Sequence, residues 1–303
     1  MQQFMIGQYG GFDHEKYHKD FKDGFYGMEA CLFPAHEDCL ILMKEAKDRG
    51  FRIGVHFPFR ADASRMRDPL VLSTDQAVRS GAFQHIREEL EYLTAVRPEY
   101  ILFHYPKPVI LDERVNWQTW KFGDSREFIA ENEITAEELL ERSEEWFDWL
   151  SRQSSKYGFI PVLEFDALSQ LIYEHDFLEQ LLLRYPRIKL CLDTARLYLQ
   201  DQLDPHFDAA AILRRYTQYA YLIHLSNVQI NGGVKHRHYP VLPELCPNEG
   251  WAPVEEYLRI IRAENSSVKI LFEHRSDLIS EEDLQRCYSW VDGILNGAAG
   301  QNT

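Results

Sequence analysis

The chain has few cysteines and no long apolar run, and each shortage excludes a class of protein. Its five cysteines, among 303 residues, form no CxxC pair, so neither a disulfide framework nor a zinc site built from thiolates is indicated. No apolar stretch approaches the ~20 residues of a membrane-spanning helix. The N-terminal stretch MQQFMIGQYGG lacks the basic and apolar regions of a signal peptide. We therefore expect a cytoplasmic protein with reduced cysteines and no membrane partner.

Basic residues are fewer than acidic ones. The chain has 33 Lys and Arg against 48 Asp and Glu, which gives a net charge of −15. Because proteins that coat nucleic acid neutralise phosphates with Lys and Arg, this charge argues against a nucleic-acid partner. A local basic patch stays open, since Arg60, Arg65 and Arg67 cluster in one predicted loop. The share of hydrophobic residues, 45%, is that of an ordinary globular protein with a large core.

Short runs with strand composition alternate with stretches that carry helical signals. A helix is predicted over residues 36–49, before Gly50. Further helices are predicted from a capping box at Thr135 and Glu138, and from Ser280 with Asp283. Residues 168–184, 203–217 and 251–263 are expected to supply the remaining helices. The eight strand runs are FMIGQYG (4–10), YGMEACLF (26–33), FRIGVHF (51–57), YILFHYP (100–106), FIPVLEF (159–165), IKLCLD (188–193), YLIHLS (221–226) and VKILFEH (268–274).

This alternation predicts an α/β fold, the (β/α)8 TIM barrel. Strands that alternate with helices imply parallel strands joined by right-handed crossovers, and the active site of such a barrel lies at the C-terminal ends of its strands. We expect one domain over residues 1–303, with the barrel over about 4–295 and a flexible tail over about 297–303. The longest irregular segment, 105–133, is expected to be functional, with an exposed insertion of no catalytic role as the alternative.

Side chains that can ligate a metal lie at or just past the ends of six strand runs. One such residue alone is more often a hydrogen-bonded structural group, but barrel strands converge at these ends. Burying three carboxylates together without cations would cost several kcal/mol, and a divalent metal removes that conflict. The His, Asp and Glu donors suit Zn²⁺, Mn²⁺, Co²⁺ or Mg²⁺. The six residues are His56, His104, Glu164, Asp193, His224 and Glu273.

Four of these motifs, taken in order, resemble one superfamily. VLEF with Glu164, LDTAR with Asp193, LIHLSN with His224 and LFEH with Glu273 look like the xylose isomerase-like TIM barrels. That superfamily includes sugar epimerases of the tagatose epimerase type and the endonuclease IV family (AP endonuclease family 2). The resemblance implies that these four residues hold one divalent metal. It also implies that the two glutamates are the acid/base pair that moves a substrate proton.

Two further motifs resemble the endonuclease IV branch. GVHFP with His56 and LFHYP with His104 match histidines that bind a second metal there, together with the shared glutamate. A binuclear site is therefore a hypothesis for this chain. The alternative is that both histidines contact the substrate or support another ligand.

The sequence departs from the superfamily at Arg196, where both branches commonly have histidine in Asp-Thr-x-His. Because a guanidinium stays protonated, Arg196 cannot ligate a metal, which puts a third metal in doubt. Its charge suits a substrate phosphate or carboxylate, or it pairs with a neighbouring carboxylate. The segment after Gly232 resembles the superfamily's substrate loop, although a solvated basic turn is the alternative. Its candidate contacts for anions or hydroxyls are Lys235, His236, Arg237 and His238.

Two functions follow as hypotheses. The first is a metal-dependent isomerase or epimerase whose partner is a small carbohydrate, free or phosphorylated. The second is a phosphodiesterase that resembles endonuclease IV. His56 and His104 favour it, as do the arginines of RADASRMR, among which Arg60 would bind phosphate. A third hypothesis is a binding protein that keeps the barrel fold but has lost catalytic activity. The substrate, the metal and the question of a homo-oligomer stay open.

Overall fold

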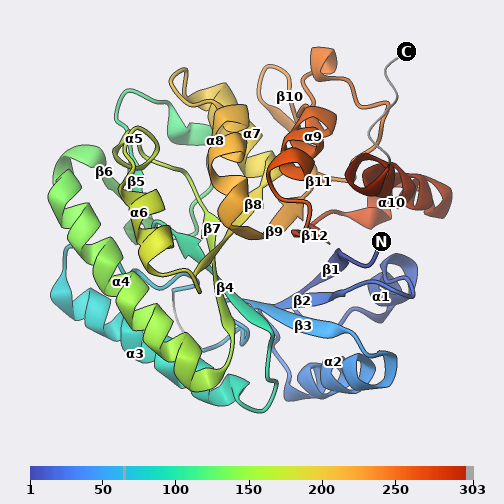
Figure 1. The fold of residues 1–303 in the computed structure, drawn as a ribbon, viewed down its shortest axis with the longest axis horizontal. Coiled ribbons are helices and arrows are strands. Elements are labelled where there is room, and N and C mark those ends of the chain that lie inside the picture. The colour runs from blue at the N-terminus through green and yellow to red at the C-terminus, as the bar shows by residue number, and fades with distance from the viewer. Residues whose placement is uncertain (64–65, 298–303) are drawn as a thin grey trace. The chain divides into compact units, whose positions relative to one another are not determined.

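The computed structural model describes residues 1–63 and 66–297. Eight strands form a closed parallel barrel in the order β1-β12-β9-β8-β7-β4-β3-β2 (Figure 1), which confirms the predicted α/β (β/α)8 fold. Arg65 and residues 298–303 of the predicted flexible tail lie outside the described residues. The barrel strands are β1 (Phe4–Tyr9), β2 (Gly27–Cys31), β3 (Arg52–His56), β4 (Tyr100–Tyr105), β7 (Ile160–Phe165), β8 (Lys189–Asp193), β9 (Ala220–Leu225) and β12 (Lys269–Phe272).

Helices follow the strands along the chain. The capping box of Thr135 and Glu138 begins α4, and Gly50 ends α2 in the left-handed conformation, as predicted. Among the described residues, no helix has the length and apolar character needed to cross a membrane. The α-helices are α1 (His14–Asp20), α2 (His36–Arg49), α3 (Gln76–Leu93), α4 (Ala136–Tyr157), α5 (Gln170–Tyr173), α6 (Phe177–Arg184), α7 (Thr194–Leu203), α8 (Ala209–Tyr216), α9 (Val254–Glu264) and α10 (Glu281–Asn296).

The chain divides into two compact units. The first comprises Met1–Ile6, His14–Tyr26 and Leu192–Thr303, and the second comprises Gly7–Asp13 and Gly27–Cys191. The expectation of a single domain therefore stays a prediction. Four of the five cysteines are buried, and all five are free thiols.

In the second unit, helices α3 and α4 lie side by side (Figure 1) and pack through aromatic rings. The Phe83 ring centroid lies 4.9 Å from that of Trp149, and Phe103 of β4 meets Trp146 edge-on at 5.4 Å. All six residues of β4 are buried, as expected for a parallel strand covered on both faces.

The segment 105–133 is less irregular than expected. It contains the parallel pair β5 (Val109–Leu111) and β6 (Phe128–Ala130). Short 3-10 turns connect and follow these two strands, at Trp117–Thr119, Ser125–Glu127 and Glu131–Glu133.

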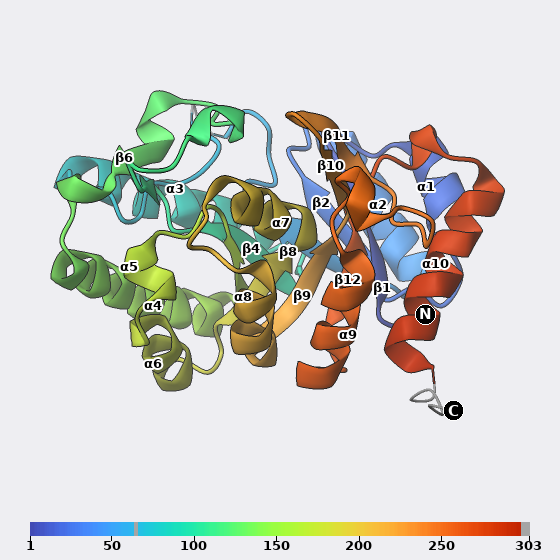
Figure 2. The same cartoon turned by 90° about the horizontal axis from the view of Figure 1, so that it is seen from above.

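In the first unit, helices α9 and α10 lie side by side (Figure 2). An aromatic cluster packs the α10 residue Tyr288 against Phe272 at 4.7 Å and against Phe25 at 5.2 Å. The antiparallel pair β10 (Asn227–Ile230) and β11 (Val234–Tyr239) follows β9. Further 3-10 turns are Thr217–Tyr219, Pro247–Glu249 and Ser276–Leu278.

Candidate metal centre

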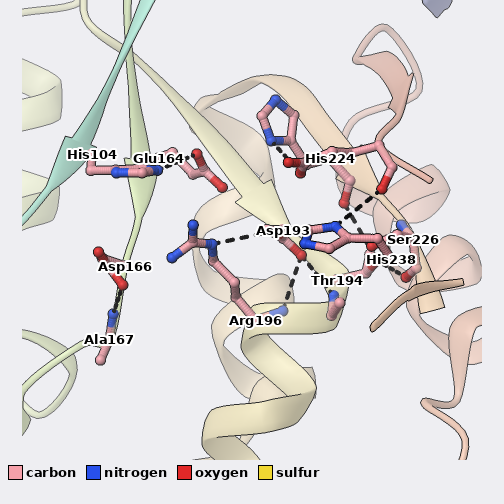
Figure 3. Close-up of polar contacts among 12 residues, drawn as sticks. His104, Glu164, Asp166, Ala167, Asp193, Thr194, Arg196, His224, Ser226 and His238 are labelled. Atoms are coloured by element: carbon pink, nitrogen blue, oxygen red, sulfur yellow. Dashed lines mark hydrogen bonds and ion pairs between the residues drawn. The ribbon is translucent and has the colours of Figure 1, made fainter. Parts of the chain in front are cut away.

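Two histidines converge on one glutamate in the second unit. His104 of β4 lies opposite Glu164 of β7 in the strand register, and its Nε2 is 3.1 Å from Glu164 Oε2. His56 ends β3, and its Nε2 lies 3.3 Å from the same oxygen. All three side chains are buried, and Figure 3 shows His104 turned toward Glu164. The strand ends thus bring together the three residues predicted for the second metal.

The remaining ring nitrogens of these histidines face acceptors. His56 Nδ1 lies 3.1 Å from the carbonyl oxygen of Phe57, and His104 Nδ1 lies 3.0 Å from both carboxylate oxygens of Asp68. A carbonyl and an ionised carboxylate can only accept, so both Nδ1 atoms donate. Both Nε2 atoms are consequently directed at Glu164, as is usual when histidines ligate a metal.

This buried group needs positive charge. Burial by itself lowers the pKa of His56, yet Cys31 and Glu164 raise it well above the ordinary value. The charge of Glu164 can thus be balanced by a proton on His56 or by a divalent cation. The ligand atoms of His56, His104 and Glu164 lie within 4.8 Å of one another, and imidazole nitrogen with carboxylate oxygen suits Zn²⁺, Mn²⁺ or Co²⁺. These residues therefore fit a metal ion.

A second cluster of ligand types lies in the first unit. Asp193 ends β8, His224 lies on β9, and Glu273 directly follows β12. His224 Nδ1 is 3.1 Å from Glu273 Oε2, and the ligand atoms of the three residues lie within 4.8 Å of one another. Asp193 and His224 are buried, whereas the Glu273 side chain is 36% exposed. This donor set also fits a divalent metal.

The stretch KLCLDTARL passes from strand to helix without a loop. Asp193 is the N-cap of α7, and its Oδ1 accepts from the backbone N–H groups of Ala195, at 2.8 Å, and Arg196, at 3.0 Å. The Arg196 side chain reaches back toward Asp193 (Figure 3), with Nε 3.5 Å from Oδ2. The structure thus gives Arg196 the carboxylate partner that was the alternative reading of the sequence.

The predicted substrate contacts after Gly232 lie on β11 rather than in a loop. His236 is exposed and stacks on Trp251 at 5.5 Å, and His238 Nδ1 lies 3.3 Å from the carbonyl oxygen of Glu273. Burial and the nearby charge of Arg196 lower the pKa of Arg237. Arg196 and Arg237 are therefore close enough to repel each other.

The predicted phosphate contact Arg60 is bound to a buried carboxylate. Its Nε lies 2.8 Å from Glu89 Oε2 and its backbone N–H donates to Glu89 Oε1 at 2.9 Å. The guanidinium also lies 4.4 Å from the centre of the Tyr92 ring. Arg67 lies over Tyr9 at 5.6 Å. A phosphate-binding role for Arg60 stays a prediction.

Sequence reasoning missed a buried lysine next to the histidines. Lys107 Nζ lies 2.8 Å from both Asp68 Oδ2 and Asp166 Oδ2, and 3.6 Å from Glu127. Lys107 is only 2% exposed. The one available signal was Asp166, which follows Glu164 by two residues in VLEFDA.

The fold is similar to that of several solved proteins. A Thermus thermophilus protein soaked with ZnCl2 is 17% identical, with a TM-score of 0.61 over 98% of this chain and 100% of that chain. D-psicose 3-epimerase with D-tagatose from Clostridium cellulolyticum is 15% identical, with a TM-score of 0.59 over 97% and 99% of the two chains. The E. coli 3-keto-D-glucoside 4-epimerase is 11% identical, with a TM-score of 0.58 over 95% and 98%.

No family model matches the chain, and no curated protein matches it in sequence. At identities this low, structural likeness concerns the fold. A xylose isomerase-like TIM barrel protein from Mycobacterium smegmatis, in complex with magnesium, is 13% identical, with a TM-score of 0.51 over 90% of this chain and 84% of that chain. The chain has the fold of the xylose isomerase-like TIM barrels.

Proposed function

We propose that this chain is a divalent-metal-dependent isomerase or epimerase of sugars or sugar phosphates. The observation that carries the proposal is the cluster of Asp193, His224 and Glu273 at three strand ends. Glu164 is proposed as the fourth ligand. The motif VLEF, which resembles the ligand motif of the xylose isomerase-like barrels, supports this role.

The proposed chemistry is proton transfer between the substrate and two glutamates. A bound divalent cation would supply positive charge that acidifies the C–H next to a substrate carbonyl. One of the two glutamates, Glu164 and Glu273, would take this proton and the other would return one, because two bases at different positions allow the proton to leave and arrive on different faces or carbons. The partial exposure of Glu273 leaves it room to contact a substrate.

Substrate contacts are proposed for the basic side chains of the first unit. Arg196 and Arg237 repel each other, and an anionic substrate group between them would relieve that repulsion. His236 and His238 of β11 are proposed hydroxyl contacts. The solved epimerases with this fold, whose names include D-psicose 3-epimerase and 3-keto-D-glucoside 4-epimerase, support a carbohydrate as substrate.

A phosphodiesterase is the second candidate. The convergence of His56 and His104 on Glu164 favours it, because two metals sharing a carboxylate can activate water and stabilise a leaving oxygen. The net charge of −15 and the pairing of Arg60 with Glu89 weigh against a nucleic-acid substrate.

Solvent-exchange experiments test the proposal. The metal-loaded protein is incubated in D2O with a panel of ketoses and ketose phosphates, and deuterium in the sugars is measured by mass spectrometry. We expect exchange with the parent and its loss in Glu273→Gln. Glu244→Gln, which changes an exposed glutamate paired with Arg286, is the matched control and should exchange normally. Phosphodiester hydrolysis without any sugar exchange would instead support the second candidate.

A further inference from the structure

Asp68 lies between a buried histidine and a buried lysine in the second unit. Both of its carboxylate oxygens lie 3.0 Å from His104 Nδ1, and its Oδ2 lies 2.8 Å from Lys107 Nζ. Asp68, His104 and Lys107 are each at most 5% exposed. Neither the proposed ligand set nor the proposed proton transfer gives Asp68 a role.

Lys107 determines what Asp68 can do. The ammonium of Lys107 lies 2.8 Å from Asp68 Oδ2, and a cation at this distance favours the ionised carboxylate. The ionised carboxylate can only accept hydrogen bonds, so His104 must donate to it from Nδ1. The opposite nitrogen, Nε2, then points at Glu164, 3.1 Å away.

We propose that Asp68, held by Lys107, is a positioning residue that fixes His104 as the tautomer whose Nε2 is available to a metal. The proposal rests on the proposed function in so far as it invokes a metal next to His56, His104 and Glu164. The tautomer itself is a property of the metal-free protein, so it can be tested separately.

The substitution Asp68→Asn should weaken the preference for this tautomer. The ammonium of Lys107 has only hydrogens to donate, so it would retain the amide oxygen at the present place of Oδ2. The amide N–H group would then take the place of Oδ1, also 3.0 Å from His104 Nδ1, where it competes with the retained oxygen. Part of the population should therefore carry the ring proton on Nε2. An Asp→Asn change next to a histidine is known to act in this way with little change of geometry.

Asp166→Asn is the matched control. Asp166 lies at the same distance, 2.8 Å, from Lys107 Nζ, so its substitution removes the same charge from the same lysine. Its Oδ1 accepts from Trp120 Nε1 at 3.0 Å and from the backbone N–H of Ala167 at 3.0 Å. If Lys107 and its two carboxylates had a purely structural role, Asp68→Asn and Asp166→Asn would have equal effects on the His104 tautomer and on zinc binding.

Nitrogen NMR and zinc titration measure the two consequences. In ¹⁵N-histidine-labelled, metal-free protein at alkaline pH, with His104 assigned by His104→Gln, we expect a protonated Nδ1 in the parent and in Asp166→Asn. Asp68→Asn should show a clearly larger share of protonated Nε2. In calorimetric titrations with ZnCl2, Asp68→Asn should bind the second zinc about 10- to 100-fold more weakly and the first zinc unchanged.

The outcomes separate this inference from the proposed function. A protonated Nε2 of His104 in the parent overturns the inference without any variant, as do equal effects of the two Asn substitutions on the tautomer. If the parent binds one zinc only while Asp68→Asn shifts the tautomer toward protonated Nε2, the positioning role of Asp68 stands and the second metal of the proposed function is wrong.

Discussion

At the scale of single residues, Asp193 uses its two carboxylate oxygens differently. Oδ1 caps α7 through two backbone N–H groups, and Oδ2 lies 3.5 Å from Arg196 Nε. The cap fixes the carboxylate at the point where β8 ends. A strand-end ligand is thus held in place by the helix that it begins, and its loss should affect both stability and metal binding.

Replacing Asp193 by Ala separates these two effects when compared with another N-cap. Asp75 caps α3 through Ala77 and Val78 and lies in neither ligand cluster. Each Asp→Ala change should cost about 1 kcal/mol of unfolding free energy through the lost cap, but only Asp193→Ala should lower metal occupancy sharply. Urea unfolding and elemental analysis measure the two quantities. Full metal retention in Asp193→Ala would contradict the ligand assignment.

Arg196 should discriminate between charged and neutral ligands. A charge-assisted hydrogen bond contributes roughly 1.5 to 3 kcal/mol, so Arg196→Met should bind phosphorylated or carboxylated sugars one to two decades more weakly and spare neutral sugars. Arg214→Met, in which an exposed arginine of α8 is replaced, is the control. Equal binding of every ligand by Arg196→Met and the parent would leave Arg196 as the ion-pair partner of Asp193 only.

At the scale of elements, the barrel strands could be predicted because each is a short apolar run. Three helices, α1, α3 and α7, were not predicted. Helix α7 begins at Thr194 because Asp193, the last residue of β8, is also its N-cap. No turn residue separates the strand from the helix, so the sequence predicts a helix only from residue 203. Helix α3 contains Gly81 and the buried Glu89, whose partner Arg60 is 29 residues away. Such distant pairing leaves no local pattern.

The candidate site, too, could be predicted only in part. Its ligand types could be predicted, since they end strand runs. The group around Lys107 could not be predicted, because its members are far apart in the sequence. Asp68 lies 36 residues before its partner His104, and Asp166 lies 46 residues after its partner Trp120. Only the folded loops bring such residues together, so their contact cannot be predicted from the loop sequences alone.

Gly54 of β3 should be irreplaceable for steric reasons. It lies opposite Tyr100 of β4 in the register, and a Cβ atom there would overlap the Tyr100 ring. That ring extends to Glu29, which accepts from its hydroxyl at 2.8 Å. Gly54→Ala should therefore lower the unfolding free energy by about 1 to 3 kcal/mol. Gly7→Ala in β1, where no atom lies within 4 Å of the added Cβ, should cost far less; equal losses in urea unfolding would contradict this account.

At the scale of the whole molecule, an acidic chain keeps its buried carboxylates paired. Glu89 lies against Arg60, Glu29 accepts from Tyr100, and Asp20 accepts from Ser276 at 2.9 Å. His274 differs from these groups. It is buried, and within residues 1–63 and 66–297 neither of its ring nitrogens has a hydrogen-bond partner. The pH dependence of stability should therefore depend on His274.

Burial, with the charges of Lys16 and Lys19, lowers the pKa of His274 to about 3, against ~6.5 in the unfolded chain. Between these values the unfolded state binds the extra proton, so His274 destabilises the fold as pH falls below about 6.5, by at most ~1.4 kcal/mol per pH unit. In EDTA, urea unfolding of His274→Phe should show a shallower loss of stability from pH 6.5 to 4 than the parent. His206→Phe, at an exposed histidine, should keep the parent's slope. The same slope in all three proteins would mean that His274 takes up a proton in the folded state, and that water reaches its ring.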